Sequence, residues 1–209
     1  MANNNEHSTQ VNTLVENEKP EYRAFNISIL TENRSGLLNA VTIIFTRRKI
    51  NIDSINVSES EVEGVSRYTI VVHTTKEQVE KVVKRLRKLV DVFWAFVYEQ
   101  DEIYYQEIAL YKVPTAVFLD GDKAEHLVRN NGARILVIEE NYIIIEKTGH
   151  QHETQDLFEK LKPYGVLEFV RSGRVAMSKS TRRTDDFLET LRNVSNNNDS
   201  NQTVNTKSK

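Results

Sequence analysis

The sequence predicts an α+β protein made of two consecutive units, each with the element order β-α-β-β-α-β. Some short segments alternate apolar and polar residues, as half-buried strands do. Between them lie segments in which apolar residues recur at helical spacing. All seven glycines lie between residues 36 and 173, where they separate these segments. The 209-residue length leaves room for one or two domains, and both ends of the chain are poor in apolar residues.

The first unit is expected over residues 22–98. Its first strand, YRAFNISIL, alternates apolar and polar residues. One helix is predicted over 37–48, and a second begins after Thr75, which forms a capping box with Gln78. The four strands are predicted at 22–30, 51–59, 65–74 and 90–98.

The second unit is expected over residues 107–180, after an acidic linker at 99–106. Its strands are predicted at 107–113, 133–138 and 142–147, with a last strand at 166–170 and 175–178 that is interrupted or bent at Gly173. Its helices are predicted at 122–131 and 153–162. Both units then have the ferredoxin-like split βαβ order. Residues 1–21 and 181–209 are expected to be mostly disordered, because they hold too little apolar surface to offset the entropy of ordering them.

Charge and composition exclude several classes of protein. The 28 basic and 30 acidic side chains give a net charge of −2, which offers no electrostatic reason to expect nucleic acid. The absence of cysteine excludes disulfides and a thiol nucleophile. The polar N-terminus does not resemble a secretory signal, and no apolar run is long enough to span a bilayer. A cytoplasmic protein without a membrane partner is expected.

The sequence offers no catalytic residues. None of the motifs GxSxG, Walker A, HExxH or GxGxxG occurs. His150 and His152 are the one pair with the spacing of metal ligands, and nothing spaced beside them completes a site, so solvated loop histidines are expected. We therefore expect neither a metal nor a cofactor on this chain.

A run of basic residues on the second helix raises the possibility of phosphate or RNA binding. The run lies opposite the apolar stripe of that helix, which favours a solvated surface. An RNA-binding sheet also needs exposed aromatic residues, and the third strand offers only Tyr68. The basic residues are Lys76, Lys81, Lys84, Arg85, Arg87 and Lys88.

The junction between the first strand and the first helix, residues 32–38 (ENRSGLL), is the most distinctive feature. A helix N-terminus presents unpaired N–H groups and the positive end of a dipole, which suit a carboxylate. Gly36 would let a ligand approach the backbone, and Asn33 can cap the helix or bind the ligand. Asn51 and Ile52, on the adjacent second strand, could add polar and apolar contacts. The physics alone leaves plain capping by Asn33 or Ser35 equally open.

Five segments, taken together, resemble one known family. Residues 33–38 (NRSGLL), followed by 51–55 (NIDSI), lie in a stretch, 24–98, that resembles an ACT domain, a ferredoxin-like module that binds amino acids at domain interfaces. This pair is similar to the branch found in acetolactate synthase (acetohydroxyacid synthase) small subunits. The other similar segments are Lys88–Val92 (KLVDV), Glu107–Val113 (EIALYKV) and Arg171–Ala176 (RSGRVA).

The resemblance implies a non-catalytic regulatory subunit in the biosynthesis of valine, leucine and isoleucine. Members of this family form homodimers, activate a thiamine-diphosphate-dependent catalytic (large) subunit, and make it sensitive to feedback inhibition by valine or another branched-chain amino acid. Thiamine diphosphate and Mg are then expected on the catalytic subunit. The second unit resembles the family's C-terminal domain, associated with dimerisation and with contact to the catalytic subunit.

The resemblance also implies a binding site at the dimer interface. One chain would hold the carboxylate of the amino acid, and the other would meet its amino group and side chain. The first set is Asn33 with the backbone around Gly36, Leu37 and Leu38, and the second set is Asn51 and Ile52. Two other functions remain open: a free-standing ACT-type amino-acid sensor for another enzyme, and an RNA-binding ferredoxin-like protein.

The sequence departs from the family pattern at two places. The turn before the second strand often contains glycine in the family, and here it reads Arg47-Arg48-Lys49-Ile50. If this turn needs a positive φ, Lys49 costs on the order of 1 kcal/mol. The stretch 114–122 (PTAVFLDGD) is apolar where the family is usually polar and helical. It predicts a late helix start, or exposure of Phe118 and Leu119 to a partner.

Overall fold

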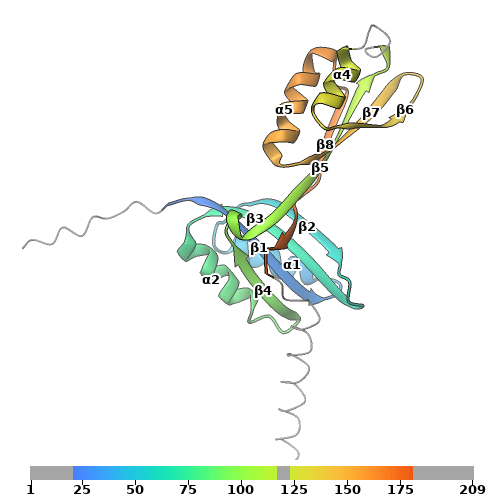
Figure 1. Ribbon diagram of the computed structural model, residues 1–209. Helices are drawn as coiled ribbons and strands as arrows, with labels where there is room; N and C mark the ends of the chain where they lie inside the picture. Colours follow the sequence, from blue (N-terminus) through green and yellow to red (C-terminus); the bar gives the residue numbers. More distant parts are fainter. Residues whose placement is uncertain (1–20, 117–122, 181–209) are drawn as a thin grey trace, which may run out of the picture.

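The computed structural model describes residues 21–116 and 123–180, which form two α+β units joined by one long strand (Figure 1). In Figure 1 the first unit is the blue-to-green lobe, the second is the yellow-to-orange lobe, and β5 passes from one to the other. Each unit has an antiparallel sheet with helices on one face, so the two ferredoxin-like domains are confirmed. No helix in the described ranges is long and apolar enough to cross a membrane.

The first unit has its strands in the order β2-β3-β1-β4, so β2 and β4 are the edge strands. The predicted alternation in β1 places Phe25, Ile27 and Ile29 in the core, each 1% exposed or less. Helices α1 and α2 cover this face of the sheet. The elements are β1 (Arg23–Glu32), α1 (Leu37–Thr46), β2 (Ile52–Glu59), β3 (Val65–Thr74), α2 (Lys76–Leu86) and β4 (Val92–Tyr98).

The predicted capping box of α2 forms only in part. The Thr75 hydroxyl accepts a hydrogen bond from the backbone N–H of Gln78 at 3.4 Å, as expected for an N-cap. The side-chain oxygen of Gln78, however, accepts a hydrogen bond from the Thr74 hydroxyl at 3.0 Å. A competing side-chain partner on β3 therefore takes the place of the reciprocal bond.

The second unit repeats the topology, in the order β6-β7-β5-β8. Its core surrounds Tyr111, whose hydroxyl donates to the backbone oxygen of Thr154 at 2.6 Å. Burial raises the pKa of Tyr111, so the hydroxyl stays protonated and can donate. The elements are β5 (Ile103–Pro114), α4 (Lys123–Asn130), β6 (Arg134–Ile138), β7 (Tyr142–Gly149), α5 (Gln151–Leu161), β8 (Glu168–Arg171) and β9 (Val175–Ser178).

The region between the units differs from the expectation. In place of a linker at 99–106 there is one 3₁₀ turn, Gln100–Glu102, followed by the first four residues of β5. The last strand is divided into β8 and β9. Strand β8 pairs with the second half of β5, whereas β9 pairs with its first half, from Ile103 to Gln106. The first half of β5 and β9 thus form a two-stranded ribbon beside the first unit (Figure 1).

Several predictions fall on residues that the structure does not describe. The expected disordered ends, apart from Glu21, lie outside the described residues. Phe118 and Leu119, expected at a partner surface, also lie outside them.

Candidate functional site

The N-terminus of α1 has no side-chain cap. Gly36 is the N-cap residue, in a left-handed conformation with φ 85° and ψ −12°, and no side chain within the described ranges accepts a hydrogen bond from the first turn. The first turn also contains no acidic residue. A Cβ placed at Gly36 would meet nothing within 4 Å, so the space in front of this helix end is open. The helix therefore presents N–H groups and its positive dipole end to an external acceptor.

Asn33 does not cap α1. Its side-chain amide donates to the carboxylate of Glu59, at the end of β2, over a long 3.4 Å, and its backbone N–H bonds to the oxygen of Gly64 at 2.8 Å. Capping by Asn33 or Ser35, which the sequence left open, is therefore not what the structure shows. A side chain bound this weakly at the surface can exchange its partner for a ligand.

The two leucines that follow Gly36 point in different directions. Leu37 is buried, at 4% exposure, and fixes the helix start on the core. Leu38 is 45% exposed, so its side chain offers an apolar surface beside the open helix end. Leu37 therefore anchors the start of α1, and Leu38 remains available to contact a ligand or another chain.

Lys49 adopts a positive φ, which the sequence had left open for this turn. Its φ is 56°, and no other non-glycine residue of the described ranges has a positive φ. The backbone N–H of Ile50 bonds to the oxygen of Phe45 at 3.1 Å, so the turn closes as a helix end with a left-handed residue does. Asn51 follows as an exposed residue, and Ile52 is half-buried against the first core.

Within one chain, the two halves of the predicted site lie at opposite ends of the first sheet. Ile52 pairs with Val72, near the start of β1. Asn33 follows the end of β1 and contacts Glu59, seven residues farther along β2 than Ile52. One chain therefore does not bring its own Asn33 and Ile52 together, and a combined site needs a second copy.

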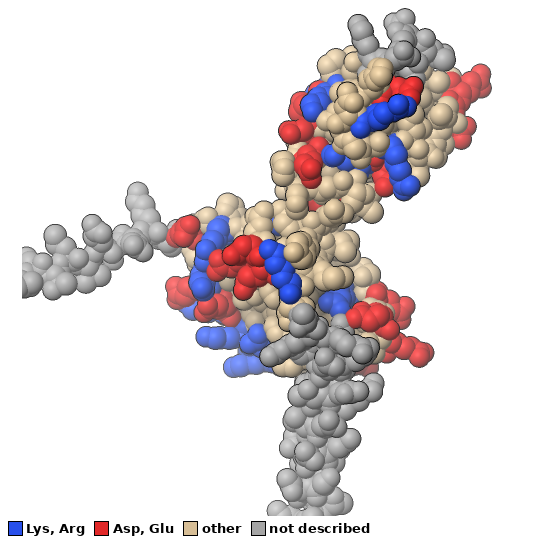
Figure 2. Space-filling model, in the orientation of Figure 1, with Lys and Arg blue, Asp and Glu red and all other residues tan. Residues whose placement is uncertain are grey.

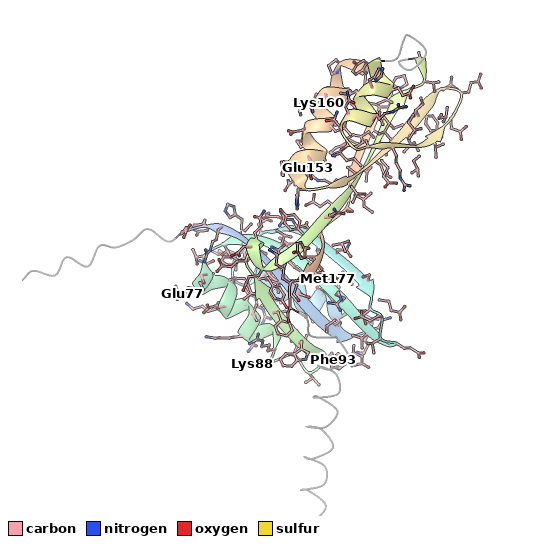
Figure 3. The ribbon with its side chains drawn as sticks, in the orientation of Figure 1. Glu77, Lys88, Phe93, Glu153, Lys160 and Met177 are labelled. Atoms are coloured by element: carbon pink, nitrogen blue, oxygen red, sulfur yellow. The ribbon has the colours of Figure 1, made fainter. Side chains whose placement is uncertain are left out.

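His150 and His152, expected as solvated loop residues, lie at the start of α5: His150 is its half-buried N-cap residue, with its ring 4.5 Å from that of Tyr105, and His152 is exposed on the helix. The rings of His150 and His152 stack at 5.8 Å, and the described residues contain no group of three His, Asp or Glu side chains placed to hold a metal. Tyr68 is buried, so it offers no stacking surface for RNA on β3. The basic residues on α2 are exposed on the side away from the core, as Figure 2 shows for part of this surface. Lys88, labelled in Figure 3, follows the end of α2 and is also exposed.

The structure also contains a polar cluster that the sequence did not reveal. Glu107 is buried and lies between two guanidinium groups, Arg171 at 3.4 Å and Arg174 at 3.2 Å. Arg174 also donates to the side-chain oxygen of Asn26, in β1, at 3.2 Å. The cluster borders a cavity of about 660 Å³ that both units line. The one signal in the sequence was that Glu107 falls on the same side of its strand as Ala109, Tyr111 and Val113, where a charged residue is unusual.

The fold and the first unit define the class of this protein. Residues 27–93 match a family model described as "AHAS small subunit-like ACT domain", so the first unit is an ACT domain. Residues 106–180 match a second family model, "Small subunit of acetolactate synthase". The chain therefore belongs to the acetolactate synthase small-subunit family.

Individual relatives agree with this assignment. The chain is 35% identical over 166 residues to the acetolactate synthase small subunit of Bacillus subtilis (strain 168), covering 79% of this chain and 96% of that protein. It is 35% identical over 158 residues to the small subunit of Mycobacterium leprae, covering 75% and 92%. A crystal structure of the small subunit from Thermotoga maritima superposes with a TM-score of 0.69 at 31% identity, covering 77% of this chain and 99% of that one.

Proposed function

We propose that this chain is a non-catalytic regulatory subunit that activates the catalytic subunit of acetolactate synthase and makes it sensitive to a branched-chain amino acid such as valine. Its membership of the acetolactate synthase small-subunit family supports the catalytic subunit as its partner. The uncapped N-terminus of α1, with Gly36 in front of open space, carries the proposal of an amino-acid site.

In the proposed complex, the helix end holds the carboxylate of the amino acid. The Asn33 side chain and the backbone around Gly36, Leu37 and Leu38 form this half of the site. The second half comes from another copy of the chain, in which Asn51 meets the amino group and Ile52 contacts the aliphatic side chain. The distance between these two halves within one chain supports a site shared between two copies.

An antiparallel pairing of two β2 edge strands satisfies this geometry. Strand β2 lies at the edge of its sheet. In such a pair, Ile52 at the start of one strand would lie beside Glu59 at the end of the other, and Glu59 contacts Asn33. We therefore propose a homodimer with two equivalent amino-acid sites.

The catalytic subunit would hold thiamine diphosphate and Mg²⁺, and this chain would act on it through assembly. For the amino acid to inhibit, it must bind one arrangement of the complex more tightly than the other. By reciprocity, the same difference in affinity sets how far the catalytic subunit changes valine binding by this chain.

The amino-acid site is tested with Gly36→Asp and a matched control, Gly36→Asn. Both variants introduce a side chain at a left-handed position in open space, and they differ mainly in charge. The aspartate would repel the carboxylate of the ligand. We expect calorimetry to show valine binding at least about tenfold weaker in Gly36→Asp than in Gly36→Asn, which corresponds to about 1.4 kcal/mol. Equal affinities in two folded variants would place the site elsewhere.

The regulatory role is tested by assaying the catalytic subunit with and without this chain across a valine titration. We expect higher activity when the chain is present, and a loss of that activity as valine is added. Valine binding without co-purification of a thiamine-diphosphate enzyme would favour an amino-acid sensor for another partner. If the chain neither activates nor confers a valine response, the proposed function is wrong.

A further inference from the structure

The two units meet where the turn at residues 171–174 lies against β2. A Cβ placed on Gly173 would lie 2.9 Å from the backbone oxygen of Ile55 and 3.1 Å from its carbonyl carbon. Both atoms belong to the backbone of a paired strand, so neither can move aside as a flexible side chain would. Glycine therefore permits a contact between the turn and β2 that any larger residue would push apart.

Arg174 forms the polar bridge across this contact. It is 8% exposed, and its guanidinium lies 4.1 Å from the centre of the Tyr105 ring. One nitrogen lies 3.2 Å from the Glu107 carboxylate within the second unit, and another donates to the side-chain oxygen of Asn26 in the first unit at 3.2 Å. We call Asn26, Ser54, Ile55, Glu107 and the turn 171–174 the seam.

The ionic part of the seam belongs to the second unit alone. The buried carboxylate of Glu107 has both its guanidinium partners, Arg171 and Arg174, on the same unit. If the units separated, these ion pairs would remain, and the Arg174–Asn26 bond would exchange for water. The seam can therefore open without leaving a buried charge unpaired.

The first-unit side of the seam is incompletely satisfied. On this side, the buried polar atoms Asn26 Nδ2 and Ser54 Oγ make no hydrogen bond to other described residues, and on the second-unit side the same is true of Arg171 Nη1. They surround or adjoin the cavity of about 660 Å³, which Ile52, Ser54 and Ile55 line from β2 and residues 171–174 line from the second unit. An interface with a cavity and unpaired polar atoms is held less firmly than a packed core.

The same strand connects the seam to the proposed amino-acid site. Ile52 lies three residues before Ile55, and the pairing of β2 with β3 shifts between Ile52 and Ser54. Such an irregularity lets a strand change its local geometry without losing its pairing on either side. A ligand held at Ile52 would therefore act on the segment of β2 that touches Gly173.

We propose that the turn 171–174 couples the amino-acid site to the second unit, with Gly173 and Arg174 as positioning residues. This inference rests on the proposed function. Ligand at the start of β2 moves the Ile55–Asn56 peptide against Gly173, and the contact with Arg174 and Asn26 opens or closes accordingly. The orientation of the second unit, and of its surface for the catalytic subunit, then follows the state of the site.

The inference is tested with Gly173→Ala, because the added methyl group would hold the seam open. No positive φ is recorded for Gly173, so alanine brings no left-handed strain of its own. We expect the isolated chain to bind valine within about threefold of the unchanged chain, while the valine concentration that half-inhibits the complete enzyme rises about tenfold or more. Arg174→Gln should act in the same direction. Arg134→Gln, which removes an exposed arginine paired with Glu146 in the same unit, is the matched control and should change neither value.

The possible outcomes separate the two proposals. If the unchanged chain binds no valine, the proposed function fails and the coupling fails with it. If Gly173→Ala leaves both binding and inhibition unchanged, the coupling role is wrong, although the amino-acid site stands. If folded Gly173→Ala and Arg174→Gln lose binding and inhibition together, the turn has a structural role only, which also overturns the inference.

Discussion

The first sheet has the order β2-β3-β1-β4 and the second has β6-β7-β5-β8, so corresponding strands occupy corresponding places. The first and fourth strands nevertheless differ. In the first unit, β1 and β4 pair within a single sheet, whereas β5 begins before its sheet and its partner is divided into β8 and β9. The first unit thus has an uncovered helix end and an edge strand, β2, whereas the second unit extends the ribbon of β5 and β9 beyond its own sheet. The same fold can therefore leave an end and an edge uncovered in one unit and extend two of its strands to the neighbouring unit in the other.

The largest expected effect on stability comes from a substitution in the core of the first unit. Phe45 in α1 is 1% exposed and lies in the first core. Phe45→Ala should lower the free energy of unfolding by about 3–5 kcal/mol, because it removes a large buried ring and leaves a cavity. Urea denaturation followed by circular dichroism measures this loss. The neighbouring Thr46 is exposed, and Thr46→Ala should change stability by less than about 0.5 kcal/mol. Similar effects of the two substitutions would contradict the described core.

The second core depends on a buried hydroxyl. Tyr111→Phe removes the 2.6 Å bond to the Thr154 backbone oxygen that joins β5 to α5. We expect a loss of about 1–2 kcal/mol in the free energy of unfolding, measured in the same way. Tyr104 lies on the same strand but is 70% exposed, so Tyr104→Phe should be neutral. A neutral Tyr111→Phe would show that the second core does not need this bond.

The turn before β2 offers a gain of stability. Lys49→Gly removes a left-handed non-glycine residue, and the unfolding free energy should rise by about 0.5–1 kcal/mol. Thermal unfolding is the measurement. Lys49→Ala is the control, because alanine keeps the strain and should give no gain. If glycine and alanine behaved alike, the positive φ of Lys49 would not be a source of strain.

The smallest expected effect on stability depends on pH, and it distinguishes the N-terminal cap of α5 from that of α2. The backbone N–H of His150 donates to Glu153 at 2.6 Å, and this bond lowers the pKa of Glu153. A lowered pKa in the folded state adds stability above the usual glutamate pKa, and that stability is lost as the pH falls through the lowered value. Glu153→Gln should therefore cost about 0.5 kcal/mol at neutral pH and less in acid.

The matching cap of α2 is uncharged and serves as the control. Thr75→Ala removes the hydroxyl that accepts from Gln78. We expect its cost, about 1 kcal/mol, to stay the same between pH 7 and pH 3. If Glu153→Gln also had the same cost at both pH values, the bond from His150 would not contribute through the charge of Glu153.

Local patterns in the sequence were enough for most elements of both units. The strand predicted from the alternation in β1 and the helix predicted from the spacing in α2 are both confirmed. Each element buries one face, and a periodic pattern of apolar residues arises from burial of one face. The sequence left open whether the turn into β2 needs a positive φ at Lys49, and the structure shows that it does. For the six residues of the candidate site, the structure gives positions only: Gly36 is the N-cap of α1 and Ile52 starts β2, but β3 lies between β2 and β1, so the two sets are not side by side within one chain.

What the sequence did not reveal depends on contacts between distant residues. The start of β5 was taken for a linker, because its short segment IYYQ takes its pairing from β9, more than sixty residues later. The last strand was expected to be interrupted or bent at Gly173, and its division into β8 and β9 confirms this, but the close approach of Gly173 to Ile55 is non-local and was not predicted. Glu107 and Arg174 are 67 residues apart, and no periodicity connects them.

The continuity of β5 has a practical consequence for dissecting this protein. A fragment that ends after β4 keeps all four strands of the first sheet, yet it loses Ile103, Arg174 and the ribbon that lies on the sheet's helix-free face. Asn26, which bonds to Arg174, and Val71, which lines the same cavity as residues 171–174, are each 4% exposed or less in the whole chain and would lose part of their cover. Such a fragment would expose a sheet surface that is buried in the whole chain, and exposed apolar surface promotes aggregation. Poor solubility of an isolated first unit would therefore result from the truncation and would say nothing about the proposed amino-acid site.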